Sequence, residues 1–200
     1  MTPQQFIARW GYGGDAFDLN EEQGAQSHFL ELCELLDVPK PGSADYHFEE
    51  KSALIGGRTG YADVFKRGCF AWENKAPGKN LDAALRQLLT YSLALSNPPL
   101  LVVCDRLTIR IHTQFNGHPS EVYAVRLEEL DQPEKRALLR KDLAERTFTK
   151  LYNLCPAWLD TAHKALDVAV ARAYGWSDYS ADMPDEEILQ RLLALNLERS

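Results

Sequence analysis

Long hydrophobic runs are missing from this sequence of 200 residues. The longest apolar run, Leu100–Cys104, has five residues, whereas a membrane-spanning helix needs about 20. The first residues, Met1 to Phe6, contain neither a basic start nor an apolar core, so they predict no signal peptide. We therefore expect a cytoplasmic protein that does not bind membranes.

Cysteine is also scarce. The chain has four cysteines, at 33, 69, 104 and 155, and none of them forms a C-x-x-C pair. With the five histidines they show no zinc-ligand spacing, and we expect reduced, mostly buried thiols. A glycine-rich loop between a strand and a helix is missing too, because Gly56, Gly57 and Gly60 connect two predicted strands.

Positive charge is in the minority, with 22 Lys and Arg against 29 Asp and Glu and a net charge of −7. Residues 51–80 are the exception, since this stretch is locally basic. A basic stretch in an acidic chain can face the phosphates of a nucleic acid. The basic residues expected to bind such phosphates are Arg58, Lys66, Arg67 and Lys79. The alternative is an ordinary solvated turn.

Hydrophobic periodicity divides the chain into an α/β part and a helical part. The pattern predicts helices at 2–10, from 20 to the proline at 39, and at 81–96, and strands at 46–55, 61–66, 69–76, 100–104, 108–113 and 121–127. Beyond residue 131 it predicts only helices and loops, with helices at 134–146, 157–173 and 185–197. This order is typical of an α/β fold with a mixed central sheet, followed by an α-helical C-terminal tail.

Two acids and a lysine lie in neighbouring predicted strands. Asp63 is in the first strand, and Glu73 and Lys75 are two residues apart in the second. Alternation along a strand places Glu73 and Lys75 on one face, and antiparallel pairing lets Asp63 reach the same face. Carboxylates suit Mg²⁺, with Mn²⁺ as the alternative ion, and such a metal polarises a phosphate and activates a bound water.

Lys75 then orients this water and stabilises the charge that develops on the phosphate. The pattern therefore predicts metal-assisted phosphodiester hydrolysis, and the alternative is a solvated aspartate beside a surface Glu–Lys pair. Gln87 and Tyr91 lie four residues apart on the next helix, so they share a face and can project toward the site. Glu49 and Glu50 in the preceding strand offer a third carboxylate, and we expect Glu50 to bind the metal.

The order Asp63…Glu73-Asn74-Lys75, followed by Gln87 and Tyr91, resembles the PD-(D/E)xK nucleases, particularly the RecB-like members. A longer series of sequence blocks resembles the N-terminal endonuclease domain of MmeI-type (type IIL) restriction–modification enzymes. These blocks include Gly60–Val64, Gly68–Lys75 and Asn97–Val103. The resemblance covers residues 1–140 and implies a restriction-endonuclease-like core that cleaves double-stranded DNA. It also places Gln26 where related nucleases often present a ligand.

Residues 141–200 resemble the opposite end of the same family. The matching blocks include Leu151–Asn153, Pro156–Asp160 and Ala173–Trp176. Between these two ends, family members carry an adenine methyltransferase domain and a target-recognition domain. The resemblance therefore implies an internally deleted relative, with an endonuclease domain at 1–140 and a C-terminal helical segment at 141–200.

These residues are compatible with three functions. The first is a Mg²⁺-dependent DNA endonuclease, which would need a homodimer to cut both strands. The second is a catalytically silent remnant or interaction module of such an enzyme. The third is a methyltransferase, but Asn97-Pro98-Pro99-Leu100 lacks the aromatic residue that ends the N-P-P-[YF] motif. We expect an endonuclease that does not bind S-adenosylmethionine.

Overall fold

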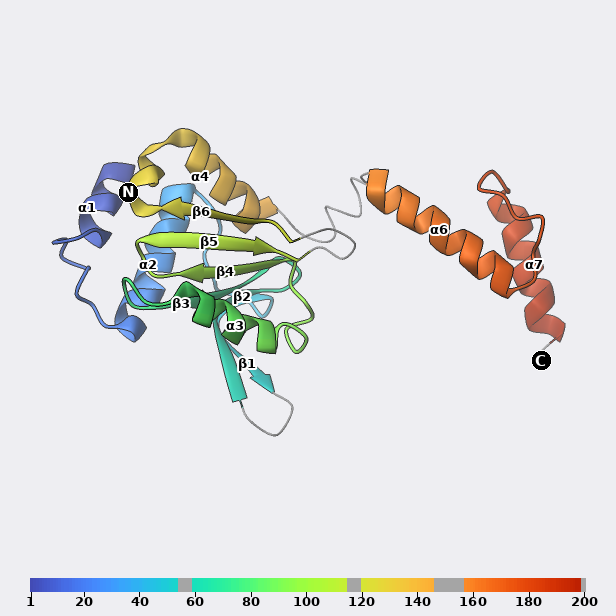
Figure 1. Cartoon of the computed structure of the whole chain (residues 1–200), viewed down its shortest axis with the longest axis horizontal. Coiled ribbons are helices and arrows are strands. Elements are labelled where there is room, and N and C mark those ends of the chain that lie inside the picture. Colours follow the sequence, from blue (N-terminus) through green and yellow to red (C-terminus); the bar gives the residue numbers. More distant parts are fainter. Residues whose placement is uncertain (54–58, 115–119, 146–156, 199–200) are drawn as a thin grey trace. The chain divides into compact units, whose positions relative to one another are not determined.

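The computed structural model of the chain describes residues 1–53, 59–114, 120–145 and 157–198. The chain divides into two compact units, Met1–Lys150 and Leu151–Ser200. The first unit contains a β-sheet with helices packed on it, and the described residues of the second unit form two helices (Figure 1). The predicted active-site residues Asp63, Glu73 and Lys75 all belong to the first unit.

Two capped helices precede the sheet. In α1 (Pro3–Trp10), the Thr2 hydroxyl accepts from the main-chain N–H of Gln5, and the Gln5 side chain accepts from the N–H of Thr2. In α2 (Glu21–Leu36), the Asn20 side chain accepts from the N–H of Gln23 at 2.7 Å. These side chains satisfy main-chain donors that the first turn of a helix leaves open, so the sequence itself sets where both helices begin.

The remaining elements of the first unit build the sheet and close it. The strands are β1 (Tyr46–Ala53), β2 (Thr59–Lys66), β3 (Phe70–Asn74), β4 (Leu100–Cys104), β5 (Thr108–Thr113) and β6 (Val122–Arg126). Helix α3 (Leu81–Tyr91) connects β3 to β4. A 3₁₀ turn (Leu127–Asp131), α4 (Pro133–Arg140) and a π-helical turn (Lys141–Glu145) follow β6.

The six strands lie in sequence order from β1 to β6. Strands β3 and β4 run parallel, joined by α3, and every other neighbouring pair is antiparallel. A parallel pair requires a crossover connection, and a helix is the usual one. The predicted fold class, α/β with a mixed central sheet followed by helices, is confirmed.

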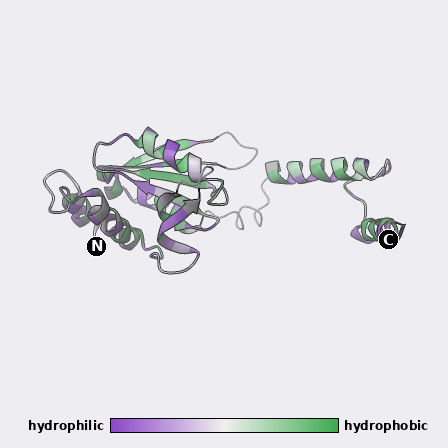
Figure 2. Ribbon diagram, turned by 90° about the horizontal axis from the view of Figure 1, so that it is seen from below, coloured by the Kyte–Doolittle hydropathy of each residue, from purple (hydrophilic) through white to green (hydrophobic). Residues whose placement is uncertain are grey.

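The two faces of the sheet bury different hydrophobic clusters. The larger cluster joins α1, α2 and α4 to one face and is centred on aromatic rings, including Phe29, Phe70 and Trp72. The smaller cluster joins α3 to the opposite face through Ala71 and Leu88. Figure 2 shows the hydrophobic residues following the central strands. Strands β3 and β4 are buried along their whole length, as expected for strands that are covered on both faces.

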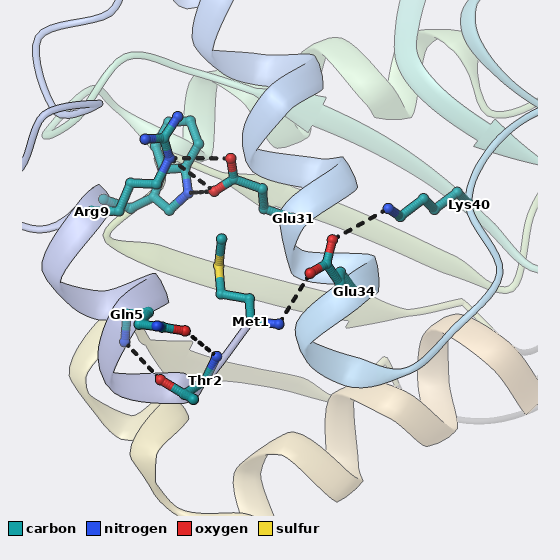
Figure 3. A network of polar contacts seen from close by, with 8 residues as sticks. Met1, Thr2, Gln5, Arg9, Glu31, Glu34 and Lys40 are labelled. Atoms are coloured by element: carbon teal, nitrogen blue, oxygen red, sulfur yellow. Dashed lines mark hydrogen bonds and ion pairs between the residues drawn. The ribbon is translucent and has the colours of Figure 1, made fainter.

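Polar contacts tie α1 to α2 (Figure 3). Glu31 of α2 accepts hydrogen bonds from Nε of Arg9 at 3.1 Å and from Nε1 of Trp10 at 2.8 Å. At the other end of α2, Glu34 forms ion pairs with the α-amino group of Met1 at 3.0 Å and with Lys40 at 3.5 Å. The ion pairs of Glu34 are exposed and add little stability, whereas the contacts of Glu31 are partly buried.

One predicted helix is shorter in the structure than expected. The pattern predicted a helix to residue 96, but α3 ends at Tyr91 and the chain continues in turns. Ser96 and Asn97 have φ angles of +61° and +48°, and the Asn97 N–H donates to the carbonyl of Ser92 at 2.7 Å. The turns that follow α3 thus end in two left-handed residues before Pro98, and asparagine tolerates this conformation better than most residues do.

Three of the four expected thiols can be placed. Cys33, Cys69 and Cys104 are buried thiols, which agrees with the prediction of reduced, mostly buried cysteines. Burial raises the pKa of the Cys104 thiol to about 12. Cys155 lies outside the described residues.

The described part of the second unit includes the helices α6 (Ala157–Ala173) and α7 (Asp185–Glu198). Arg191 of α7 holds Asp178 with two hydrogen bonds of 2.8 and 2.6 Å, and this contact lowers the pKa of the Asp178 carboxyl to about 2. The same guanidinium lies 5.5 Å from the ring centroid of Trp176. None of the described helices combines the length and the low charge that crossing a lipid bilayer requires.

The buried His28 makes the stability of the fold depend on pH. Its ring lies 5.2 Å from that of Phe6 and 4.9 Å from that of Trp10, and its side chain is 0% exposed. Burial is the main cause that lowers the pKa of His28 from 6.5 to about 3, and the positive charge of Arg106 is the second cause. Between these two values the unfolded chain binds a proton that the folded chain excludes.

The free energy of unfolding should therefore be highest above pH 6.5 and fall as the pH drops toward 3. By this linkage His28 alone costs about 2 kcal/mol at about pH 5. Urea unfolding near pH 7 and near pH 5 measures the loss in the wild type and in His28→Phe, which keeps a ring between Phe6 and Trp10. We expect a smaller loss in the variant, and equal losses in both proteins would contradict this role of His28.

Candidate active site

Asp63 lies where β2 and β3 stop pairing. The last paired residue of β2 in the ladder with β3 is Val64, the residue that follows Asp63 in the chain. There the Oδ2 atom of Asp63 accepts a hydrogen bond from the main-chain N–H of Asn74 at 2.6 Å. The carboxylate thus occupies the place that a main-chain carbonyl would take in a continued ladder. It is held beside the main chain between Glu73 and Lys75.

Glu73 and Lys75 form an ion pair at the end of β3. The Nζ atom of Lys75 lies 2.8 Å from Oε1 of Glu73, and the exposed fractions of the two side chains are 22% and 3%. The main-chain N–H of Lys75 donates to the carbonyl of Cys104 at 2.7 Å, which extends the β3–β4 ladder. The structure therefore brings the predicted aspartate, glutamate and lysine to one end of two adjacent strands. Asp63 faces α2 there, whereas alternation from Ala71 places Glu73 toward α3, so the convergence of the two carboxylates on one metal stays a prediction.

Glu49 is the glutamate that lies beside Asp63. Its φ angle is +60° in the middle of β1, a conformation that is uncommon for a residue with a side chain and costs of order 1–3 kcal/mol. The ladder between β1 and β2 skips the position at which Glu49 faces Asp63. Both residues line a small cavity of about 60 Å³ together with Gln26 and Asn74. Gln26 donates from Nε2 to Oε1 of Glu49 at 3.3 Å.

Glu50, the predicted third metal ligand, has a different partner. Its Oε2 atom lies 2.6 Å from Nε2 of His47, and the His47 ring lies 6.1 Å from the ring of Phe65 on the α3 face of the sheet. The left-handed conformation of Glu49 interrupts the alternation along β1, so that Phe48 and Glu49 both face α2 and Glu50 faces α3. A metal role for Glu50 stays a prediction, and the geometry favours Glu49.

Tyr91, from the predicted Gln87–Tyr91 pair, packs on β2. A Cβ atom at Gly60 would lie 2.2 Å from Cε1 of Tyr91, so only glycine fits beneath the ring. Tyr91 belongs to the hydrophobic cluster that includes Ala71, two residues before Glu73 on the same face of β3. Gln87 lies one turn earlier on α3 and is half-buried.

The basic residues expected near phosphates are engaged in different ways. Lys66 donates to the carbonyl of Leu143 at 2.8 Å, and its ammonium lies 5.2 Å from the Tyr46 ring. Arg67 pairs with Asp45 at 2.7 Å on the surface, and Lys79 is exposed. Arg58 lies outside the described residues. The structure thus gives Lys66 a role in holding the π-helical turn, and the phosphate contacts of this group stay predictions.

The donor set fits a cation that keeps most of its water. Within the described ranges, no three His, Cys, Asp or Glu side chains gather into a group that would hold a metal ion. A closed zinc-type cage needs four ligands. Magnesium uses one or two carboxylates and retains several waters, so Asp63 and Glu73, with Glu49 near Asp63, suit it.

Comparison with protein families identifies the chain. The family described as "MmeI, N-terminal domain" matches residues 1–170. The chain belongs to this family. The match spans the whole sheet and the candidate site, so the predicted MmeI-type resemblance is confirmed. The predicted boundary at 140 and the assignment of 141–200 to the family's C-terminus stay predictions.

The other comparisons are more remote. A cryo-electron microscopy structure of a DrdV–DNA complex is 18% identical to this MmeI-family chain, with a TM-score of 0.40. The match covers 68% of this chain and 13% of that one, so the chain corresponds to a small part of that protein's length. No curated protein matches the chain.

The contact between Gly60 and Tyr91 can be tested directly. Gly60→Ala places a methyl group inside the Tyr91 ring, and such overpacking costs about 1–3 kcal/mol. Gly42→Ala is the matched control, because a Cβ atom there meets nothing within 4 Å. Urea unfolding should show a loss for Gly60→Ala alone, and Tyr91→Leu should recover part of it in the double variant. Equal stability of the two alanine variants would refute the contact.

Proposed function

We propose that this chain is a Mg²⁺-dependent DNA endonuclease of a restriction–modification system. The observation that carries the proposal is the Asp63 carboxylate, hydrogen-bonded to the main chain between Glu73 and Lys75. Membership of the MmeI N-terminal domain family supports DNA as the substrate. The surface charge gives no independent support, since the net charge of the chain is −7.

The cost of burying charge favours a catalytic role over a structural one. Glu73 is 3% exposed and pairs with Lys75, and a buried ion pair contributes little net stability because both ions lose hydration. Asp63 adds a second carboxylate a few atoms away along the main chain. Two neighbouring carboxylates disfavour joint ionisation, and a bound cation relieves this repulsion.

Each residue then has a distinct task. Asp63 and Glu73 hold the metal, and Glu49 with Gln26 provides a further oxygen-rich wall beside Asp63. The metal supplies polarisation of the scissile phosphate and a lowered pKa for a bound water. Lys75 leaves Glu73 to orient the attacking water and to stabilise the negative charge that develops on the phosphate. Tyr91 supports the strands from the α3 face. A supporting role for Gln87, one turn earlier on α3, is part of the proposal.

Cleavage of both DNA strands requires two such sites, so the proposal includes a homodimer for double-strand cuts. A single chain would nick one strand. Methyl transfer is not part of the proposed function, since the sequence offers no glycine-rich loop between a strand and a helix.

Purified wild-type protein should convert supercoiled plasmid to open-circle or linear DNA with Mg²⁺ or Mn²⁺, and EDTA should stop the reaction. Lys75→Ala should lower the rate about 100-fold or more, since it removes the positioned charge. Lys135→Ala is the control, because Lys135 pairs with Glu129 at 3.0 Å on α4, outside the site. The rates are read from gels, with circular dichroism as the check on folding.

An unchanged cleavage rate in folded Lys75→Ala would contradict the assignment of the lysine. A wild-type protein that leaves plasmid intact with either metal would favour the silent remnant or interaction module.

A further inference from the structure

Lys51 and Tyr61 form an exposed pair next to the candidate site. The two residues are direct cross-strand partners in the β1–β2 ladder. Lys51 is exposed, and Tyr61 has 45% of its surface exposed although it is a large aromatic residue. Figure 1 shows the far ends of β1 and β2 extending beyond the other strands as a two-stranded ribbon. The pair therefore faces solvent on a projecting element.

The neighbours of Tyr61 settle which face of the ribbon the pair occupies. Gly60 lies beneath the Tyr91 ring, and Ala62 is buried in the cluster that α3 covers. Alternation along β2 then turns Tyr61 to the opposite face. Asp63, two residues further, lies on that face as well, because it lines the cavity with Gln26 of α2.

The same argument holds on β1. Glu49 contacts Gln26 of α2, and Lys51 follows Glu49 by two residues in a regular strand. Lys51 is therefore about 7 Å further along the ribbon than Glu49, at 3.4 Å per residue. The left-handed conformation of Glu49 is what brings the acidic pair and the Lys51–Tyr61 pair onto one face.

The side chains of Lys51 and Tyr61 suit the binding of a nucleic-acid strand. The carboxylates of Asp63 and Glu49 repel phosphates, so a DNA strand that lies along this face needs a cation close by. Lys51 supplies this charge, and the exposed Tyr61 ring offers a flat apolar surface against which a sugar or base can pack. The lysine thus suits the phosphate of a nucleotide, and the tyrosine ring suits its sugar or base.

We propose that Lys51 and Tyr61 bind the DNA strand next to the scissile phosphate. Lys51 contacts a flanking phosphate, and the Tyr61 ring packs against the neighbouring nucleotide. The proposal rests on the endonuclease function proposed above and adds the surface that positions the substrate. Neither residue touches the reacting atoms, so both are positioning residues.

The test measures binding apart from cleavage. The probe is a short fluorescein-labelled DNA duplex, titrated with the full chain in Ca²⁺ at several salt concentrations, and fluorescence anisotropy gives the Kd. Lys51→Gln should weaken binding and reduce the slope of log K against log salt by about 1, as the loss of one phosphate contact does. Lys51→Arg should restore the slope, and Tyr61→Ala should weaken binding several-fold while Tyr61→Phe keeps it.

Lys40→Gln is the matched control for charge. Lys40 lies beyond the C-terminal end of α2, whose last residue, Leu36, is about 15 Å along the helix from Gln26 at 1.5 Å per residue, and it pairs with Glu34. Its salt slope should stay that of the wild type. Equal slopes for Lys51→Gln and Lys40→Gln, or no duplex binding by the wild type, would overturn the inference.

The plasmid assay separates this inference from the endonuclease proposal. If Lys51→Gln alone loses the phosphate contact but the wild type never cuts plasmid, the binding surface stands and the nuclease assignment fails. If the wild type cuts plasmid and the salt slopes are equal, the nuclease assignment stands and the binding surface fails.

Discussion

The hydrogen bond between the Asp63 carboxylate and the Asn74 N–H is the contact on which the candidate site depends. It forms because the pairing of β2 with β3 ends at Val64 and Trp72, which leaves the Asn74 N–H for the side chain to satisfy. The bond fixes one carboxylate beside the residues that carry the other acid and the lysine. The proposed roles of Glu73 and Lys75 require the Asp63 carboxylate to stay hydrogen-bonded to the Asn74 N–H.

The surrounding fold holds that end of the sheet in place. On one face, α2 brings Gln26 to Glu49 and Asp63, and its start is fixed by the Asn20 cap and by Arg106. The buried Arg106 donates to the main-chain carbonyl of Asn20 at 2.7 Å. On the other face, α3 packs Tyr91 onto Gly60. The strands that carry the acids are thus held from both sides.

Local patterns predicted most of the fold. The helix at 157–173 was predicted with the bounds that the structure shows, and the wholly apolar Leu100–Cys104 is the buried β4. The pairing of Glu73 with Lys75 follows from alternation alone. These features depend on spacing within one element, which a sequence displays directly.

Features that depend on backbone conformation or on distant partners escaped prediction. Nothing in the sequence marks Glu49 as left-handed, so Glu50 was predicted at the site in its place. Lys66 meets the carbonyl of Leu143, 77 residues away, which no local pattern indicates. The Lys51–Tyr61 pair required the register of the β1–β2 ladder. The sequence would have revealed this pair only if the register between β1 and β2 had been known.

The central claim is that Asp63 and Glu73 together hold a divalent cation. Anomalous diffraction from crystals of the chain soaked in Mn²⁺ tests it most directly. The account predicts one strong anomalous peak within coordination distance of both carboxylates, and its loss in Asp63→Asn. A peak elsewhere, or an unchanged peak in Asp63→Asn, would contradict the account.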